Sequence, residues 1–521
     1  MKKLNKITLL FILVTAVTAC DSYVDIIPIA PNSENYFNSE EEYEDALIGV
    51  YDMLQTTMFN VMVGHTASDD IIAGGDPNTF DQPTLQRIDK MNHSPADNEQ
   101  IQLIWQLMYA GYNRANYVLE FEDKTDFEGK EEVIAQVYFL RSYFIFELSK
   151  FFGNVPLAVE DRNGVTRIAN TRILFGDQYN INRVESVNEI YSMLEQDLIE
   201  AIPNLPTTRP TSETYKITKG AAQALLGKIY LFHQNYPAAA TELNNVIDSG
   251  VYSLVEGSAY TNLFTFAGEN SAESVFEIQY TGVVGNNWDC LYCNAGNYMP
   301  QSNGPRSPYP NNVYKEGWGI NIISKNLYQQ FEPFDRRRGV TILAPNNGAY
   351  GMSRENSGFY NKKYLVRKDE PTVSSDPVSY QNNYRAIRYA DVLLMAAEAE
   401  AQIGGGNAIN YLNQVRQRAF NGASHAFPFN GEGNLLESIY KERRLELAGE
   451  GHRFFDLVRT GKAQEAFTEY NTFIDSEPLT DEQKIERKIN FTVGKNEVFP
   501  IPLFELNLAN AGESWGQNTG Y

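Results

Sequence analysis

The sequence predicts a mostly α-helical protein, in which a scaffold of paired helices carries an inserted, loop-rich lobe with short strands. Two observations support this fold class. Apolar residues recur at helical spacing on both sides of residues 254–379, whereas that stretch is rich in Gly, Asn, Pro, Ser and aromatic residues. No low-complexity linker divides the 521 residues, so we expect one body rather than separate domains.

The amino terminus has the pattern of an exported lipoprotein. Three lysines precede an apolar run over residues 7–17, and Thr18, Ala19 and Cys20 follow it. We therefore expect a signal peptide over residues 1–19 and a mature chain, residues 20–521, whose Cys20 is acylated as a lipid anchor. A transmembrane anchor is the alternative, but an apolar run of about eleven residues is too short for a bilayer that needs roughly 20.

Apolar residues at helical spacing predict the scaffold helices in order. Ser39 and Glu42 have the spacing of a capping box, which predicts a helix from the next residue onward. Longer amphipathic patterns predict helices over residues 101–121, 131–151 and 187–202.

Residues 217–249 have the spacing of a tetratricopeptide unit, which is a pair of antiparallel helices packed on small side chains. Leu243 takes an aromatic position and Gln223 the position of the usual tryptophan. The other matching positions of this unit are Leu226, Gly227, Tyr230 and Ala239. A weaker match to the same pattern over residues 390–418 predicts a second helix pair.

Residues 254–379 predict loops around a few short elements. Within them, residues 274–280 have the pattern of a strand and residues 320–331 that of a helix. Long irregular stretches are usually functional or disordered, and the aromatic content argues against disorder. We therefore expect the ligand-binding lobe here.

Residues 442–461, ERRLELAGEGHRFFDLVRTG, combine charges of both signs with apolar residues at helical spacing. Gly449 and Gly451 interrupt this spacing, which predicts helix, turn, helix. We expect the arginines and glutamates to pair with one another, because lone charges are rarely held against a core. The alternative is that Glu446 and Glu450 form the carboxylate pair of a surface glycoside hydrolase.

This stretch resembles the C-terminal signature of the SusD/RagB family of outer-membrane nutrient-binding lipoproteins, R-x-x-E-x-x-x-E-x-x-R-x-x-D-L-x-R-x-G. Three further parts of the chain resemble the same family: FLRSYFIFELSKFFGNVPL from Phe139, RYADVLLMAAEAEAQ from Arg388, and the closing VFPIPLFELN and QNTGY. The signature positions are Arg443, Glu446, Glu450, Arg453, Asp456, Leu457, Arg459 and Gly461.

The resemblance implies a SusD-like fold with several tetratricopeptide-like helix pairs, in a lipid-anchored protein that faces outward from the outer membrane. It further implies that the protein binds a polysaccharide or oligosaccharide and delivers it to a TonB-dependent, SusC-like transporter, without catalysis and without a cofactor. A peptide-binding member of the same family is an alternative. Ligand residues in this family come from loops, so no motif assigns them here.

The charge balance argues against nucleic acid as a ligand. The formal net charge is −23, and it becomes −26 once residues 1–19 with their three lysines are removed. No long run of Lys and Arg supplies the basic patch that a phosphate backbone requires.

Cys290 and Cys293 are the two cysteines besides Cys20. In an exported chain a disulfide is the default for such a pair, and free thiols are the alternative. A zinc site would need further Cys or His ligands, and none lies near this pair in sequence, so we expect no metal site.

The stretch after residue 285 mixes flat aromatic rings with amide and carboxylate groups. This suits sugars, because their rings have apolar C–H faces and polar rims. Packing inside the lobe is the alternative role of these aromatic rings. The predicted ligand-binding residues are Trp288, Asp289, Tyr292, Asn294 and Trp318.

Residues 65–81 form a second candidate surface, where we expect Asp69 and Asp70 to hydrogen-bond sugar hydroxyls. Calcium is the alternative, but the acids lack the spacing of an EF-hand loop. No catalytic residue is predicted: the one G-x-S-x-G match, residues 512–516, has no histidine after it in the chain.

Overall fold

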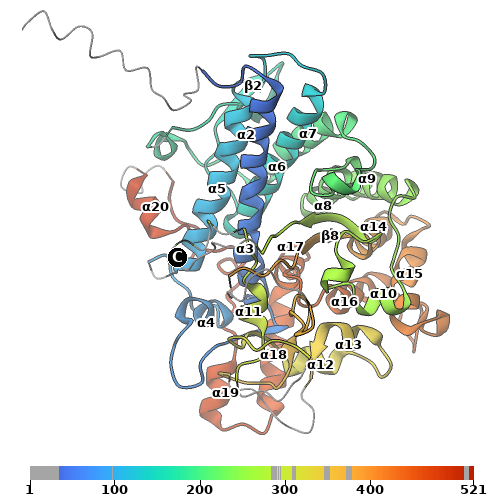
Figure 1. Cartoon of the computed structure of the whole chain (residues 1–521). Helices are drawn as coiled ribbons and strands as arrows, with labels where there is room; N and C mark the ends of the chain where they lie inside the picture. The colour runs from blue at the N-terminus through green and yellow to red at the C-terminus, as the bar shows by residue number, and fades with distance from the viewer. Residues whose placement is uncertain are drawn as a thin grey trace, which may run out of the picture.

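The computed structural model describes residues 35–96, 98–174, 176–282, 290, 293, 295–307, 313–344, 353–370, 378–509 and 515–521. The described chain is mostly helical, as the sequence predicts (Figure 1). Its α-helices are α2 (Glu40–Asp52), α3 (Thr57–Thr66), α4 (Pro83–Asp89), α5 (Glu99–Leu119), α6 (Lys130–Phe152), α7 (Val187–Ala201), α8 (Lys219–Phe232), α9 (Tyr236–Asp248), α10 (Gly257–Thr261), α11 (Met299–Asn303), α12 (Lys325–Gln330), α13 (Arg336–Thr341), α14 (Tyr389–Ile403), α15 (Ala408–Phe420), α16 (Leu435–Glu446), α17 (Arg453–Arg459), α18 (Ala463–Ser476), α19 (Asp481–Arg487) and α20 (Leu503–Leu508).

Helices that follow one another in the chain pack side by side and form the scaffold. Helix α5 packs on α6, α6 on α7, α7 on α8 and α8 on α9, and the row continues from α9 to α14 and α15. Both predicted helix pairs are therefore confirmed, as α8 with α9 and α14 with α15. None of the helices in the described part of the chain is long and apolar enough to cross a membrane.

Small residues allow these helices to approach closely. A Cβ atom added to Gly227 of α8 would lie 2.6 Å from the Leu243 side chain of α9, and one added to Gly111 of α5 would lie 2.7 Å from the Phe144 ring of α6. Helix α14 is the central helix, because every residue from Tyr389 to Glu400 is buried.

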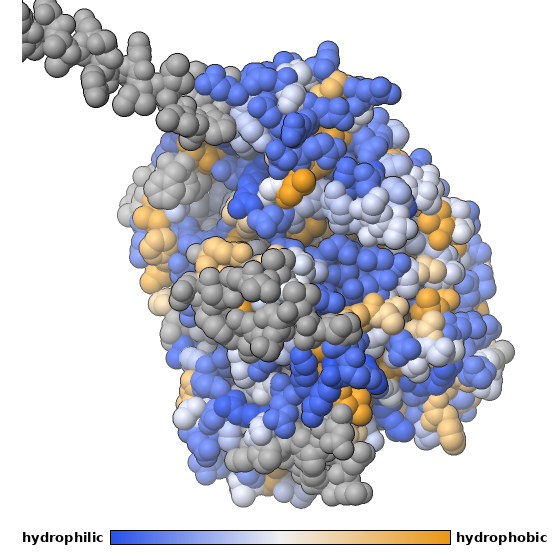
Figure 2. Space-filling model, viewed as in Figure 1, coloured by the Kyte–Doolittle hydropathy of each residue, from blue (hydrophilic) through white to orange (hydrophobic). Residues whose placement is uncertain are grey.

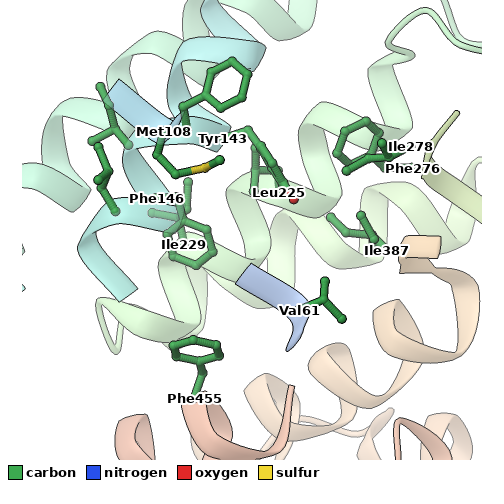
Figure 3. Packing of buried hydrophobic residues seen from close by; sticks show 14 of the residues in the cluster. Val61, Met108, Tyr143, Phe146, Leu225, Ile229, Phe276, Ile278, Ile387 and Phe455 are labelled. Carbon is green, nitrogen blue, oxygen red and sulfur yellow. The ribbon is translucent and has the colours of Figure 1, made fainter. Parts of the chain in front are cut away.

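The core lies where the scaffold meets the inserted lobe. Figure 3 shows side chains from both parts converging there, among them Met108 of α5, Phe146 of α6, Ile229 of α8, Phe276 of β4 and Phe455 of α17. Burial of apolar side chains from both parts in one cluster is the main favourable contribution to their association.

The lobe is inserted between two helices that touch. Helix α9 ends at Asp248, whose charge acts on Tyr389 at the start of α14, so residues 249–388 leave and re-enter the scaffold at one place. Strands β4 (Ser274–Ile278) and β8 (Tyr384–Arg388) pair antiparallel and form the neck of this insertion.

A four-stranded sheet inside the lobe incorporates a strand from the first part of the chain. Its order is β1 (Ile71–Gly74), β5 (Ile320–Ile323), β7 (Tyr360–Asn361) and β6 (Ile342–Leu343), with antiparallel neighbours. A separate hairpin, β2 (Val159–Arg162) with β3 (Val165–Ile168), lies in the scaffold.

The predicted helix over residues 320–331 is wrong in its first third. Residues 320–323 are strand β5, because the sequence Ile-Asn-Ile-Ile favours extended backbone and pairs with the isoleucines of β1. Helix α12 begins only after Ser324, whose hydroxyl accepts a hydrogen bond from the Leu327 amide.

Residues 442–461 form the predicted helix, turn and helix, as the end of α16 followed by α17. Gly449 and Gly451 have φ values of 77° and 85°, which other residues rarely adopt. We call α16, the turn and α17 the brace. Figure 1 shows it between the scaffold helices and the lower part of the molecule, which contains α12, α13, α18 and α19.

The charges of the brace pair mostly with other elements, and not mainly with one another as predicted. Arg388, which immediately precedes α14, donates hydrogen bonds to Glu446 (2.7 Å) and Glu450 (2.8 Å). Arg443 pairs with Asp391 of α14 at 2.8 Å, although it also contacts Asp456 within the brace. The brace therefore ties the scaffold to the lobe through buried ion pairs.

Candidate functional site

The fold brings together the two segments that the sequence suggests as candidate surfaces. The loop after β1, residues 75–82, lies against Arg306 and Gly319 of the lobe. The Gly75 amide donates to the Gly319 carbonyl at 2.9 Å. Arg306 pairs with Asp76 at 2.9 Å and with Asp81 at 3.3 Å. Segments more than two hundred residues apart in sequence thus form one surface.

The loop over residues 75–82 is held in shape by its own carboxylates. Asp76 Oδ1 accepts from the Asn78 amide at 2.8 Å and from the Thr79 amide at 3.1 Å, and Asp81 Oδ1 accepts from the Asp76 amide at 2.8 Å. The hydrogen bond from Asn78, together with the charge of Arg306, lowers the pKa of Asp76. This carboxylate is therefore ionised at neutral pH, and the loop is preorganised.

Phe80 projects from this loop into solvent. Its side chain is 66% exposed, and the Arg354 guanidinium lies 4.2 Å from the ring centre. The Arg354 amide donates to the Gly75 carbonyl at 2.9 Å, so the arginine is fixed to the same loop. The exposed face of this ring, which a cation and a loop hold in place, is available for a planar or apolar ligand face to stack on.

Trp318 is the predicted ligand residue that the structure places at this surface. It is half-buried, and its ring centre lies 6.5 Å from that of Tyr298. The Trp318 amide donates to the Gln301 carbonyl, and its carbonyl accepts from Arg306 at 3.1 Å. Arg306 therefore connects Trp318 to the Phe80 loop. We call the surface formed by Phe80, Asp81, Arg306, Trp318 and Arg354 the lobe surface.

The remaining predicted ligand residues of the lobe, Trp288, Asp289, Tyr292 and Asn294, lie outside the described residues, and so does the proposed lipid anchor Cys20. Cys290 and Cys293 are described, and they are joined in a disulfide.

Asp69 and Asp70 do not have the exposure that sugar binding requires. Their relative exposures are 2% and 1%. Arg444 contacts Asp69 at 2.9 Å and Asp70 at 2.7 Å, and Arg453 contacts Asp69 at 2.8 Å. Although burial opposes ionisation, the two guanidinium groups hold the pKa of Asp69 well below its usual value. These carboxylates anchor β1 to the brace, which corrects the sequence-based expectation of ligand contact.

Glu446 and Glu450 are likewise inaccessible to a glycosidic bond, with exposures of 2% and 0%. Burial opposes their ionisation, but Arg388 and neighbouring cations hold both pKa values below the usual range. A glycoside hydrolase needs one carboxyl group protonated as the acid. This pair has neither the access nor the protonation that such chemistry demands.

Phe80 lies within residues 65–81, the second candidate surface that the sequence predicts, although it is not one of the predicted ligand residues. Its position in an acidic loop is the signal for an exposed role. No sequence pattern points to Arg306 and Arg354, since their partners Asp76, Asp81 and Gly75 come from a distant part of the chain.

The lobe surface offers groups that suit neutral sugars: an exposed aromatic face with the carboxyl group of Asp81 and two guanidinium groups around it. Among the described residues, no group of three or more His, Cys, Asp and Glu side chains could hold a metal ion. The surface is suited to binding by stacking and hydrogen bonding.

Comparison with known sequences matches the two ends of the chain to related families. Residues 337–521 match the SusD family, and residues 23–231 match a family described as "Starch-binding associating with outer membrane". The SusD-like protein P2 of Formosa agariphila is 28% identical, and the alignment covers 97% of each chain.

Solved structures of SusD-like and surface glycan-binding proteins are similar to this chain over nearly its whole length. A laminarin-binding SusD-like protein is 30% identical with a TM-score of 0.77, covering 93% of this chain and 100% of that one. Surface glycan-binding protein A from Bacteroides thetaiotaomicron, in complex with laminarihexaose, is 26% identical with a TM-score of 0.75, covering 92% and 99%.

Proposed function

Because this chain belongs to the SusD family of glycan-binding, non-catalytic proteins, we propose that it binds a neutral polysaccharide or oligosaccharide at the lobe surface. The observation that carries the proposal is Phe80, an aromatic ring that is 66% exposed on a loop fixed by ion pairs to the lobe. Exposing such a ring without a ligand is unfavourable, and fixing it in place reduces the entropic cost of binding.

The groups around Phe80 define how a glycan is held. A sugar ring stacks on the aromatic face, while Asp81 accepts hydrogen bonds from its hydroxyls and Arg306 and Arg354 donate to its oxygens. Laminarin and laminarihexaose are named for two structural relatives. A β-glucan is therefore the first ligand to test on this chain.

The wider role follows from the amino-terminal pattern and the family. Acylation at Cys20 anchors the chain to the outer membrane with the ligand-binding lobe, residues 254–379, facing outward. The protein then delivers the bound glycan to a TonB-dependent, SusC-like transporter. The family match whose description refers to the outer membrane supports this location.

The binding test uses the mature chain without Cys20. Isothermal titration with laminarihexaose measures Kd for the parent, Phe80→Ala and Trp318→Ala. We expect each substitution to weaken binding at least fivefold, taking about 1–3 kcal/mol for a stacked aromatic side chain, as for nucleobases. Ile485→Ala, which truncates another exposed side chain (75%), is the matched control and should bind like the parent.

The same samples distinguish the alternative functions. Incubation with a polysaccharide panel should give binding without shorter products, and time-dependent hydrolysis would refute the binding-only role. A peptide-binding relative would instead bind none of the glycans and retain peptides from a digest.

The location is tested in cells. Cys20→Ser should move the protein from the membrane fraction to the soluble fraction, and surface proteolysis of intact cells should cleave the parent. Copurification of a TonB-dependent transporter with the acylated parent supports delivery, and its absence from solubilised outer membranes would argue against it.

A further inference from the structure

A cavity lies in the scaffold, between elements that contribute nothing to the lobe surface. It has a volume of about 450 Å³ and lies between α5, the side chains of Ile173, Tyr179 and Ile181, α20 and Trp515. Ligand pockets usually measure about 300–1,000 Å³, so this space is large enough for a small ligand.

One wall of this cavity is a continuous row of aromatic rings. Trp105 and Tyr109, one turn apart on α5, have ring centres 4.9 Å apart. Trp105 lies 5.8 Å from Trp515, and Trp515 lies 6.0 Å from Tyr179. These spacings are those of favourable ring pairs, so the wall is well packed. Trp105 and Trp515 are only 3% and 7% exposed, and Tyr109 and Tyr179 offer the partly exposed ring faces to a ligand.

Polar groups at the edge of the cavity are held by their neighbours. Glu505 of α20 is 4% exposed and accepts hydrogen bonds from Gln106 at 2.8 Å and from Tyr179 at 3.2 Å. The Trp515 indole donates to the Ile181 carbonyl at 2.7 Å. Buried polar groups fixed in this way orient a ligand without having to rearrange.

The cavity opens beside an exposed apolar face of α20. Phe504 and Leu508 line it and are 52% and 45% exposed. Figure 2 shows hydrophobic residues gathered at the position of α20, on the left of the view. The mouth therefore attracts apolar ligand faces.

We propose that this cavity is a second carbohydrate site, which binds one end of a neutral oligosaccharide. Aromatic faces suit the apolar faces of pyranose rings, and the carboxylate and amides of Glu505, Gln106 and Asn113 suit their hydroxyls. The carboxylate and the net charge of −23 disfavour anionic ligands. The ligand class rests on the proposed glycan-binding function, but the site is separate from the lobe surface. Two sites on one chain would raise avidity for a long polysaccharide.

The test exploits the positions of the tryptophans. Of the four in the chain, Trp105 and Trp515 line the cavity and Trp318 belongs to the lobe surface. The mature chain, labelled with 5-fluorotryptophan, gives fluorine NMR signals that single Trp→Phe variants assign. It is titrated with glucose, galactose, mannose, xylose, their β-linked disaccharides and laminarihexaose.

We expect saturable shifts of the Trp105 and Trp515 signals with at least one neutral sugar. Ala110→Phe fills the cavity from α5 and should abolish these shifts, while the response of Trp318 to laminarihexaose stays unchanged. Phe504→Ala, at the exposed mouth, should weaken the sugar affinity of the cavity at least threefold and leave folding intact.

The outcomes separate the two proposals. If Trp318 responds and Trp105 and Trp515 do not respond to any sugar, the cavity site is refuted and the lobe surface stands. If Trp105 and Trp515 respond and Trp318 does not, the lobe surface is refuted and the cavity site stands. If no signal moves across the panel, both fail.

Discussion

Glu269 is a carboxyl group that the fold places where ionisation is unfavourable. Burial raises its pKa to about 7, with Arg385 opposing and Glu277 and Glu370 adding to the rise. One of its oxygens accepts from the Asn383 amide at 2.9 Å. The folded state therefore holds a proton that the unfolded chain releases near pH 4.5, so this group stabilises the fold at low pH, and that contribution is lost as the pH rises through 7.

Glu269→Gln keeps the acceptor oxygen and mimics the protonated acid at every pH. We expect the variant to match the parent near pH 4 and to exceed its free energy of unfolding by about 2–3 kcal/mol at pH 8. Urea unfolding at the two pH values measures this difference. If the substitution changed the free energy of unfolding equally at both pH values, protonation of Glu269 would not be the cause of the stabilisation.

At the scale of single residues, a sequence pattern reveals local features and conceals distant partners. The aromatic stretch around Trp318 is a local feature, and its role in ligand binding stays a prediction. Asp69 and Asp70 were assigned to a ligand because nothing near them in sequence reveals Arg444 and Arg453, which neutralise them.

At the scale of elements, the contact between α8 and α9 depends on the absence of a side chain at Gly227. Gly227→Ala raises helix propensity, but its Cβ would lie 2.6 Å from Leu243. We expect overpacking to prevail and to lower the free energy of unfolding by about 1–3 kcal/mol. Gly339→Ala in α13, where nothing lies within 4 Å, is the control and should stabilise by about 0.4–1 kcal/mol. Equal destabilisation by both would contradict this explanation.

The brace depends on Arg388, which contacts Glu273, Glu446 and Glu450 at 2.7–2.8 Å while only 1% exposed. Arg388→Met removes a cation that these three carboxylates share. We expect urea unfolding to show a free energy of unfolding that is about 3–5 kcal/mol lower than that of the parent. Arg114→Met, which removes an exposed partner of Asp52, should cost at most about 1 kcal/mol. Indistinguishable losses would mean that burial of the network does not set its energy.

The helices were predictable because their signal repeats every turn and lies within the element itself. Strand β4 was predictable too, because residues 274–280 have a strand pattern of their own. Strands β1 and β5 were not, since they are four residues long and gain their stability from each other. Residues 320–323 show this: their apolar pattern fits helix or strand, and the partner decides.

At the scale of the molecule, scaffold and lobe share the largest cluster of buried apolar side chains and are joined by buried ion pairs, while the sheet of the lobe adds two small clusters beside it. We therefore expect them to unfold together. The fluorine signals of Trp105 in the scaffold and Trp318 in the lobe should disappear at the same urea concentration. If the Trp318 signal disappeared at a lower urea concentration than the Trp105 signal, the lobe would unfold on its own. Arg388→Met should then widen the difference between the urea midpoints of the two signals.

The neck of β4 and β8 determines where this chain and its homologues can be recombined. The lobe begins and ends at one place, beside the junction of α9 and α14. Residues 279–383 can therefore be exchanged as a cassette between homologues while the helices stay unchanged. The graft must carry Arg337 and Lys363, since both contact carboxylates of the brace. It must also match the loop over residues 75–82, which the host supplies.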